Sequence, residues 1–235
     1  GSAALCNNAS GAHVKNVIAH DIRLRPNNLD KPSGILAGEA ESTVFEDCRI
    51  EDSSVINDQA CWLGGAVGKM YSGSVDGLTR SGEITVQGRR AVGGVIGQIL
   101  SNKEVSLSRI QMEGTAEISQ VLANHGSGEN RGFYNAAGLI AGLCEVNSPV
   151  SLEGIELRGI PAGAGETGAG DGLLKVKNGS DCRSYVGGFL VGSLYKSGTS
   201  NGNTLTLGTV TVENGRRLTD ETGSAGETPV CYYGG

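Results

Sequence analysis

The amino-acid sequence predicts an all-β protein folded as a parallel β-solenoid, in which the short strands of successive repeats stack on one another. Three observations lead to this prediction. A glycine pattern, Gly-x-x-x-Gly with small or apolar residues between, occurs five times, and an alternating strand pattern occurs six times. Glycine also makes up 39 of the 235 residues, which suits frequent corners and disfavours helices.

The glycine pattern is expected to form one short buried strand in each repeat, because the residues between its glycines are apolar or small, as in Gly93-Gly-Val-Ile-Gly97. With little side-chain volume at its ends, such a strand can turn sharply or lie close to its neighbours. The copies begin at Gly34, Gly64, Gly93, Gly138 and Gly188, and a further copy is expected to begin at Gly234.

The strand pattern places apolar residues at steps of two, three and two, followed by Gly, Asn or Asp. Its clearest copies cover residues 105–114, 150–159 and 205–214. Weaker copies begin at residues 12, 43 and 73, and the copy from Gly73 places Arg80 in an apolar position, which leaves its register open. The six starts lie 31, 30, 32, 45 and 55 residues apart, so a unit of about 30 residues repeats.

Each step of the strand pattern has a structural meaning. Two-residue alternation predicts a strand with one buried face, and the three-residue step predicts a bulge or bend between two short strands. The closing Gly, Asn or Asp suits a corner with positive φ. One such unit cannot bury its apolar face alone, whereas stacked units can. Since parallel crossovers are right-handed, we expect a right-handed β-helix of about six rungs.

The repeats divide the chain into three parts. Residues 1–11 form a polar lead-in, in which we interpret Gly1 and Ser2 as an expression scar, and residues 12–214 form the solenoid. Residues 215–235 are expected to be a partial cap or the start of a further repeat. We therefore interpret the chain as a fragment, monomeric but prone to end-to-end association, which contacts further repeats of its own parent chain.

Composition excludes several classes of function. The formal net charge is −6 and no Lys/Arg cluster exceeds a pair, which argues against a nucleic-acid partner. The apolar runs are too short for a membrane helix, so we expect no membrane insertion. No Gly-x-Gly-x-x-Gly motif stands between a strand and a helix, so no cofactor is expected.

Cysteine and histidine spacings predict no metal site. The six cysteines match no zinc pattern, and the three histidines share no ligand spacing. Cys48 and Cys144 are expected to be small core residues. A disulfide among the others is left open, because three of them precede a glycine pattern near one corner: Cys61, Cys182 and Cys231.

Extra length falls at about residues 115–135 and 160–185, both times between a strand pattern and the next glycine pattern. Both insertions should leave the solenoid on one side, where they could form a binding face, although neutral variation in loop length would look the same. Their candidate binding residues are His125, Glu129, Arg131, Tyr134, Glu166, Asp171 and Tyr185.

Aromatic residues gather at two repeat positions. Trp62, Tyr134 and Tyr185 all come shortly before a glycine pattern, and Tyr71 and Tyr195 both follow one by three residues. Stacked repeats would place each set in a column, which suits sugar rings or a protein partner if exposed and simply packs if buried. Trp62 is therefore a further candidate binding residue.

Two carboxylates raise an enzymatic alternative. Asp21 and Asp52 occupy the same repeat position and could stack, as a polysaccharide-cleaving site would need. Later repeats place glycine or asparagine there, which is the profile of a corner. We therefore expect no catalytic residues.

The glycine runs Val92-Gly-Gly-Val-Ile-Gly97, Leu63–Gly68 and Ala137–Gly142, with strand segments such as Val105–Gly114, resemble the GLUG motif. GLUG repeats occur in large bacterial surface and secreted proteins, including adhesins and non-catalytic parts of some immunoglobulin A proteases. The resemblance covers about residues 12–214 and brings no catalytic residues. It implies a non-enzymatic adhesion module, secreted or at the cell surface, that binds a host protein or glycan. The alternatives are a lyase or hydrolase of acidic polysaccharide and a purely structural stalk.

Overall fold

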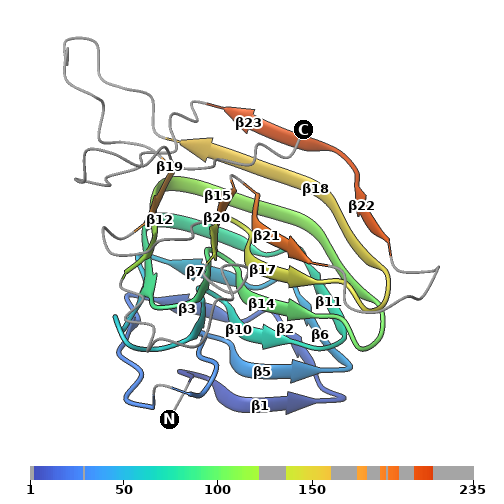
Figure 1. The fold of residues 1–235 in the computed structure, drawn as a ribbon, viewed down its shortest axis with the longest axis horizontal. Coiled ribbons are helices and arrows are strands. Elements are labelled where there is room, and N and C mark those ends of the chain that lie inside the picture. Colours follow the sequence, from blue (N-terminus) through green and yellow to red (C-terminus); the bar gives the residue numbers. More distant parts are fainter. Residues whose placement is uncertain are drawn as a thin grey trace, which may run out of the picture.

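The computed structural model describes residues 3–28, 30–121, 136–159, 174–178, 186–188, 190–195 and 204–213. Across these residues the protein is all-β, and every strand pair is parallel. The strands form sheets of six, thirteen and four members, in which strands of successive repeats lie side by side (Figure 1). The predicted all-β, parallel class is confirmed.

The six-stranded sheet takes one strand from each successive repeat, in sequence order. Its strands are β1 (Cys6–Ser10), β5 (Ala37–Glu41), β10 (Val67–Met70), β14 (Ile96–Leu100), β17 (Ala141–Glu145) and β21 (Val191–Tyr195). β1 lies inside the expected lead-in and pairs with β5. The lead-in therefore contains the edge strand of this sheet.

The four-stranded sheet precedes the six-stranded sheet within each repeat. Its strands are β9 (Trp62–Gly64), β13 (Ala91–Gly93), β16 (Ala136–Gly138) and β20 (Val186–Gly188). β13 ends at the first glycine of its pattern, Gly93, and β14 begins two residues after Gly94. The expectation of one strand per glycine pattern was therefore wrong, since the pattern spans a corner between two sheets.

The thirteen-stranded sheet is formed by the strand patterns and the segments after them. Its strands are β2 (His13–Lys15), β3 (Ile18–His20), β4 (Arg23–Leu24), β6 (Thr43–Glu46), β7 (Arg49–Glu51), β8 (Ser54–Ile56), β11 (Gly73–Asp76), β12 (Thr79–Gly88), β15 (Val105–Gln120), β18 (Val150–Gly159), β19 (Leu174–Asn178), β22 (Leu205–Leu207) and β23 (Val210–Glu213). Gly73 pairs with Thr43 and Val105, as the repeat spacing predicts. Arg80 occupies its apolar position and is fully buried.

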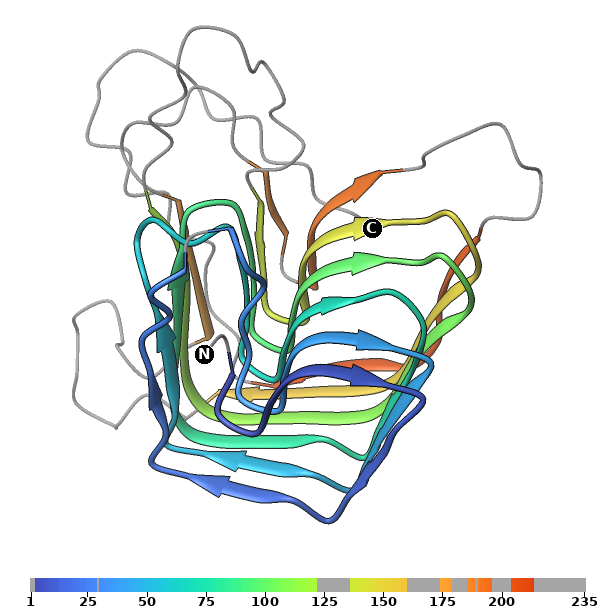
Figure 2. The ribbon, with the colours of Figure 1, turned by 90° about the horizontal axis from the view of Figure 1, so that it is seen from below.

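A further strand segment in each repeat was not predicted. Residues 83–88 of β12 pair with residues 115–120 of β15, and Ala116 of β15 pairs with Leu174 of β19. Residues 115–120 and 174–178 therefore lie in the sheet, although the sequence assigned both to insertions. Seen along the stack, the strands of each repeat follow one another around a common interior (Figure 2).

The buried core is mainly aliphatic. Cys48 and Cys144 are 2% and 0% exposed, which confirms both as core residues. At the corner that closes the strand pattern, Asp21, Asp52 and Gly82 have φ values of 54°, 45° and 77°. The predicted corner with positive φ is thus confirmed, and short polar side chains or glycine meet its requirement.

Two of the predictions concern residues that the structure does not describe. The partial cap or further repeat at 215–235 lies outside the described residues, as do Cys182 and Cys231. Cys61 is a buried free thiol. The described part of the chain contains no helix that is long and apolar enough to cross a membrane.

Candidate functional site: a polar groove at a bend in the sheet

A bend in the middle of the strand pattern creates the candidate site. At the three-residue step, Asp47, Gly77, Arg109 and Gly154 have φ values of 48°, 72°, 52° and 61°. These residues follow one another in register across four repeats, because Asp76 pairs with Glu46 and Ser108, and Ser108 pairs with Glu153. Positive φ is easily adopted by glycine and aspartate, whereas Arg109 adopts it against its intrinsic preference.

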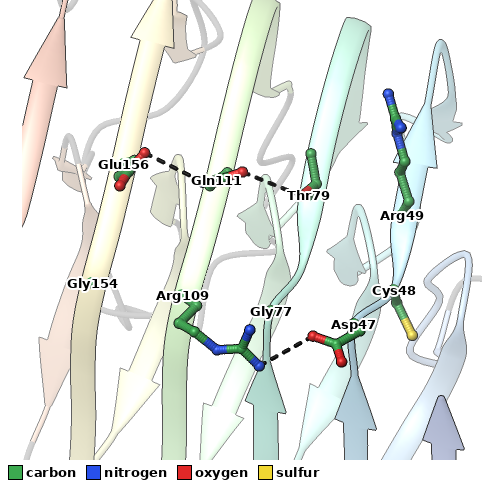
Figure 3. Close-up of a pocket in the computed structure, with 9 residues that line it drawn as sticks. All are labelled: Asp47, Cys48, Arg49, Gly77, Thr79, Arg109, Gln111, Gly154 and Glu156. Carbon is green, nitrogen blue, oxygen red and sulfur yellow. Dashed lines mark hydrogen bonds and ion pairs between the residues drawn. The ribbon is translucent and has the colours of Figure 1, made fainter. Parts of the chain in front are cut away.

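A groove of about 510 Å³ follows this bend across the four repeats (Figure 3). The two glycines add no side chain to it, so its walls are formed mainly by polar residues. Its lining residues are Asp47, Cys48, Arg49, Gly77, Thr79, Arg109, Gln111, Gly154 and Glu156.

Arg109 ties two carboxylates across the bend. Its Nε donates to Asp76 Oδ1 at 2.8 Å and its Nη2 donates to Asp76 Oδ2 at 2.8 Å, so the pair is bidentate. Nη2 also lies 3.1 Å from Oδ1 of Asp47, which belongs to the repeat before Asp76. The guanidinium is thereby fixed over three repeats, and this double pairing accounts for the unusual φ of Arg109.

The same contacts set the protonation state of Asp76. Hydrogen bonds from Arg109 and from the Ser108 hydroxyl, at 2.7 Å, lower the pKa of Asp76 from 3.8 to about 2. A carboxylate with so low a pKa stays ionised at neutral pH and cannot act as a general acid there. The carboxylate of Asp76, which pairs with the groove residue Arg109, therefore has a structural role.

Along the groove, two uncharged side chains lie between two charged ones. Thr79 Oγ1 lies 3.5 Å from Gln111 Oε1, and Gln111 Nε2 lies 3.4 Å from Glu156 Oε2 (Figure 3). Both contacts are long, so Thr79 and Gln111 keep hydrogen-bonding capacity for a ligand. Glu156 Oε2 also pairs with Arg158 Nη2 at 2.8 Å, which leaves its Oε1 as the acceptor for a ligand. Arg49 stands at the opposite end from Glu156, and its guanidinium is paired through Nε with Glu51.

The ion pair at the bend predicts a specific loss of acid stability. Replacing Arg109 by methionine is expected to lower the melting temperature near pH 6, and the difference from the wild-type protein should disappear near pH 2. The folded-state pKa of Asp76 lies below its usual value, so the pairing stabilises the fold above about pH 4 and is lost as the pH falls towards 2. Thermal melts across this pH range would measure the effect.

Lys103→Met is the matched control, because Lys103 is exposed and lies away from the bend. Its melting temperature should follow that of the wild-type protein at every pH. A difference between Arg109→Met and wild type that stays constant from pH 6 to pH 2 would contradict the assigned role of Asp76.

Of the binding residues predicted from the sequence, Trp62 is described. It is half-buried on β9, and Lys69 Nζ lies 4.4 Å from the centre of its ring. The seven other candidates lie outside the described residues: His125, Glu129, Arg131, Tyr134, Glu166, Asp171 and Tyr185.

The predicted aromatic column does not continue from Trp62. Its register neighbours are Ala91 and, one strand further, Ala136. Small residues thus flank the indole ring along the four-stranded sheet. The predicted column of Tyr71 and Tyr195 is also interrupted, because the partner of Tyr195 in the neighbouring strand is Glu145.

The stacked carboxylates and the histidines serve local structure. Asp52 Oδ1 accepts a hydrogen bond from the backbone N–H of Glu83 at 3.0 Å, and Asp21 pairs with Arg23 at 3.1 Å. His13 and His20 lie on the solvent-facing side of their strands and contact glutamates of the next repeat at 2.7 and 3.3 Å. The described residues contain no group of three or more His, Cys, Asp or Glu that could hold a metal ion.

No residue of the groove was predicted from the sequence, although one signal was present. Aligning the repeats places Asn16, Asp47, Gly77 and Gly154 at the three-residue step, all of them residue types that tolerate positive φ. Arg109 and Thr209 are the other residues in this position, and of these two Arg109 has the positive φ. Such an outlier indicates a residue held by its side-chain contacts.

Comparisons of the chain with protein-family models, with curated proteins and with solved structures found no match.

Proposed function

We propose that the protein is a non-catalytic interaction module of an exported bacterial surface protein, which binds a glycan or a host protein along the groove at the bend. The proposed architecture is a right-handed β-helix of about six rungs, of the GLUG-repeat type. Support for the architecture comes from the six-stranded sheet, in which consecutive strands are parallel and about one repeat apart. Parallel connections of this kind are right-handed in nearly all proteins.

The observation that carries the function is the row of polar groups along the groove. Arg49 supplies hydrogen-bond donors, Thr79 and Gln111 supply both donors and acceptors, and Glu156 supplies acceptors. Because they come from four successive repeats, they follow one another at the spacing of neighbouring strands, about 4.8 Å. An extended chain of hydroxyl or amide groups, such as a glycan or a peptide, matches such a row.

The carboxylates of the region favour binding over catalysis. Asp76 is held ionised by Arg109, and Asp52 accepts a backbone hydrogen bond at a corner. A glycosidase instead needs one carboxyl group with a raised pKa to act as the acid. These contacts support the proposed non-enzymatic role.

The proposal predicts that removing two groups from the groove weakens binding. We expect the double variant Arg49→Ala, Gln111→Ala to bind the ligands that the wild-type protein selects on a glycan array at least about tenfold more weakly. Two lost hydrogen bonds, one of them charged, amount to more than about 1.4 kcal/mol. Titration with each selected glycan would give the ratio of dissociation constants.

Glu83→Ala is the control, because Glu83 is exposed and lies outside the groove. It should bind as the wild-type protein does. An unchanged profile for the double variant would rule out the groove. Turnover of uronic-acid polymers that is abolished by Asp52→Ala would replace the proposal with the enzymatic alternative.

A further inference from the structure

A second group of side chains, separate from the groove, lies where the four-stranded and six-stranded sheets meet. Trp62 on β9, Lys69 on β10 and Tyr71 just after β10 form what we call the aromatic cluster. Lys69 Nζ lies 4.4 Å from the centre of the Trp62 ring and 5.7 Å from that of Tyr71. All three residues are half-buried, so the cluster is in contact with solvent.

The glycine pattern brings this cluster together. A Cβ on Gly64 would lie 2.6 Å from the backbone nitrogen of Gly97, and a Cβ on Gly97 would lie 2.8 Å from backbone atoms of Leu63. The two sheets can therefore approach to backbone contact only because these positions carry no side chain. As a result, Lys69 on one sheet reaches the ring of Trp62 on the other.

The ammonium group of Lys69 is held without an oxygen partner. Among the described residues it makes no hydrogen bond or ion pair, and its contacts are the two aromatic rings. Burial lowers the pKa of Lys69, while Glu39 and Glu145 act in the opposite direction. A half-buried ammonium with free N–H groups can gain hydrogen bonds from oxygen atoms of a ligand.

A second polar group next to Lys69 is also unsatisfied. Gln98 is the register partner of Lys69 on β14, so both side chains leave the same face of the sheet. Gln98 is 3% exposed, and its Oε1 has no hydrogen-bond partner. Buried polar atoms are nearly always hydrogen-bonded in native proteins, so we expect this oxygen to accept a hydrogen bond from a hydroxyl or amide group.

The surrounding charge selects among ligands. Glu39 is the register partner of Lys69 on the side opposite to Gln98. Burial raises the pKa of Tyr71, and Glu39 and Glu41 raise it further. Glu39 and Glu145 act on the ammonium group of Lys69, and Glu41 acts on the neighbouring Tyr71, so the local field of these three carboxylates disfavours an anionic ligand. A neutral ligand that offers both hydroxyl oxygens and hydroxyl hydrogens fits this field and both unsatisfied groups.

We propose that the aromatic cluster binds a neutral sugar ring of a glycan. Lys69 Nζ donates to sugar hydroxyl oxygens, Gln98 Oε1 accepts from a sugar hydroxyl, and the rings of Trp62 and Tyr71 contact the apolar face of the sugar. The cluster shares no residue with the groove. The proposed sugar site is therefore independent of whether the groove binds a ligand.

Trp62 is the one tryptophan of the chain, so its fluorescence reports directly on the cluster. Tetrasaccharides of glucose, galactose and mannose would be titrated against the protein, with tetragalacturonate as the anionic probe. We expect at least one neutral probe to shift the emission of Trp62 at millimolar concentration or below, and tetragalacturonate to bind at least tenfold more weakly. No shift with any neutral probe, or equal binding of tetragalacturonate, would overturn the proposal.

Two variants test the assigned contacts by calorimetry with the neutral probe that binds. Lys69→Met keeps the aliphatic stem and removes the ammonium, and Gln98→Met removes the buried oxygen; each should weaken binding at least tenfold while the melting curve shows a folded protein. The groove variant Arg49→Ala, Gln111→Ala should bind this probe as the wild-type protein does. Unchanged affinity in Lys69→Met would contradict the proposed site.

Discussion

Replacing Gly97 by valine is expected to lower the free energy of unfolding by roughly 3 kcal/mol or more. The reason is a close approach of two sheets. A Cβ at this position would lie 2.6 Å from the carbonyl oxygen of Gly68 and 2.8 Å from the backbone nitrogen and carbon of Leu63. These are backbone atoms of neighbouring repeats, so they cannot move aside without separating β9 from β14. Chemical denaturation would measure the loss.

Gly208→Ala is the matched control for the glycine substitution. Its Cβ would meet side-chain atoms of Glu153 at 3.0 and 3.3 Å, and the exposed glutamate side chain can move. We expect a change within about 0.5 kcal/mol, as for an ordinary surface substitution. Gly142, whose Cβ would lie 2.3 Å from Val92 N, should behave like Gly97. If Gly97→Val unfolds at the same denaturant concentration as the wild-type protein, the two sheets are not in backbone contact.

The expected loss of stability in Gly97→Val shows which structural role of this glycine could be predicted from the sequence. The sequence predicted that the glycine pattern turns sharply or lies close to its neighbours. At Gly97 the short backbone distances show a close approach, and Gly97 is not among the glycines with positive φ. Glycine spacing alone does not distinguish a turn from a close approach. That distinction depends on which strand lies opposite, and this is a long-range property.

Strand register was predictable because it follows from the repeat itself. The apolar positions of residues 105–114 and 150–159 match one to one, which fixes the register between the two strands. A slip by one residue would turn the buried face outwards. The segments at 83–88 and 115–120 were missed, although Ile84, Val86 and Ile118 are buried in strict alternation. Their register partners Arg23, Ser54, Thr85 and Glu117 keep the repeat spacing of 31 or 32 residues, and only the step from Ala116 to Leu174, 58 residues, departs from it.

The groove was beyond sequence reasoning for a different reason. Arg109 meets Asp47 at a distance of 62 residues along the chain, and Gln111 meets Glu156 at 45. Each residue looks like an ordinary solvent-facing position of a strand when taken alone. Their proximity depends on the bend, and no pattern of apolar residues specifies the face of the sheet on which the bend forms a groove. Trp62 was predictable as a binding candidate, but its partner Lys69 was not, since they belong to different sheets.

Arg80 gives the second large effect, because it is a charged side chain in the aliphatic interior. It is 0% exposed, and among the described residues it has no carboxylate partner. Its Nη1 donates to the carbonyl oxygen of Gly94, and its Nη2 lies 3.4 Å from that of Ser53. A Cβ on Gly65 would lie 1.6 Å from Arg80 Nη1, so this glycine makes room for the guanidinium.

Two opposing terms decide what a substitution of Arg80 does. Burial lowers the pKa of Arg80 from 12.5 to about 9, which means that the fold disfavours the charged form. Against this, the guanidinium satisfies two buried carbonyl oxygens. Met112, the register partner of Arg80 in the next repeat, shows that a methionine fits the equivalent position. We therefore expect Arg80→Met to change the free energy of unfolding by less than about 1.5 kcal/mol.

Arg80→Ala is expected to lower the free energy of unfolding by about 3–5 kcal/mol, because it leaves both carbonyl oxygens without a donor and also creates a cavity. The pH dependence separates charge from packing. The folded-state pKa of Arg80 is below its unfolded value, so the energetic penalty for burying the charged guanidinium is fully present below about pH 9. The stability of the wild-type protein relative to Arg80→Met should therefore rise between about pH 9 and pH 11. Paired denaturation curves would show this rise. A relative stability that falls over the same range would mean that the fold favours the charged guanidinium.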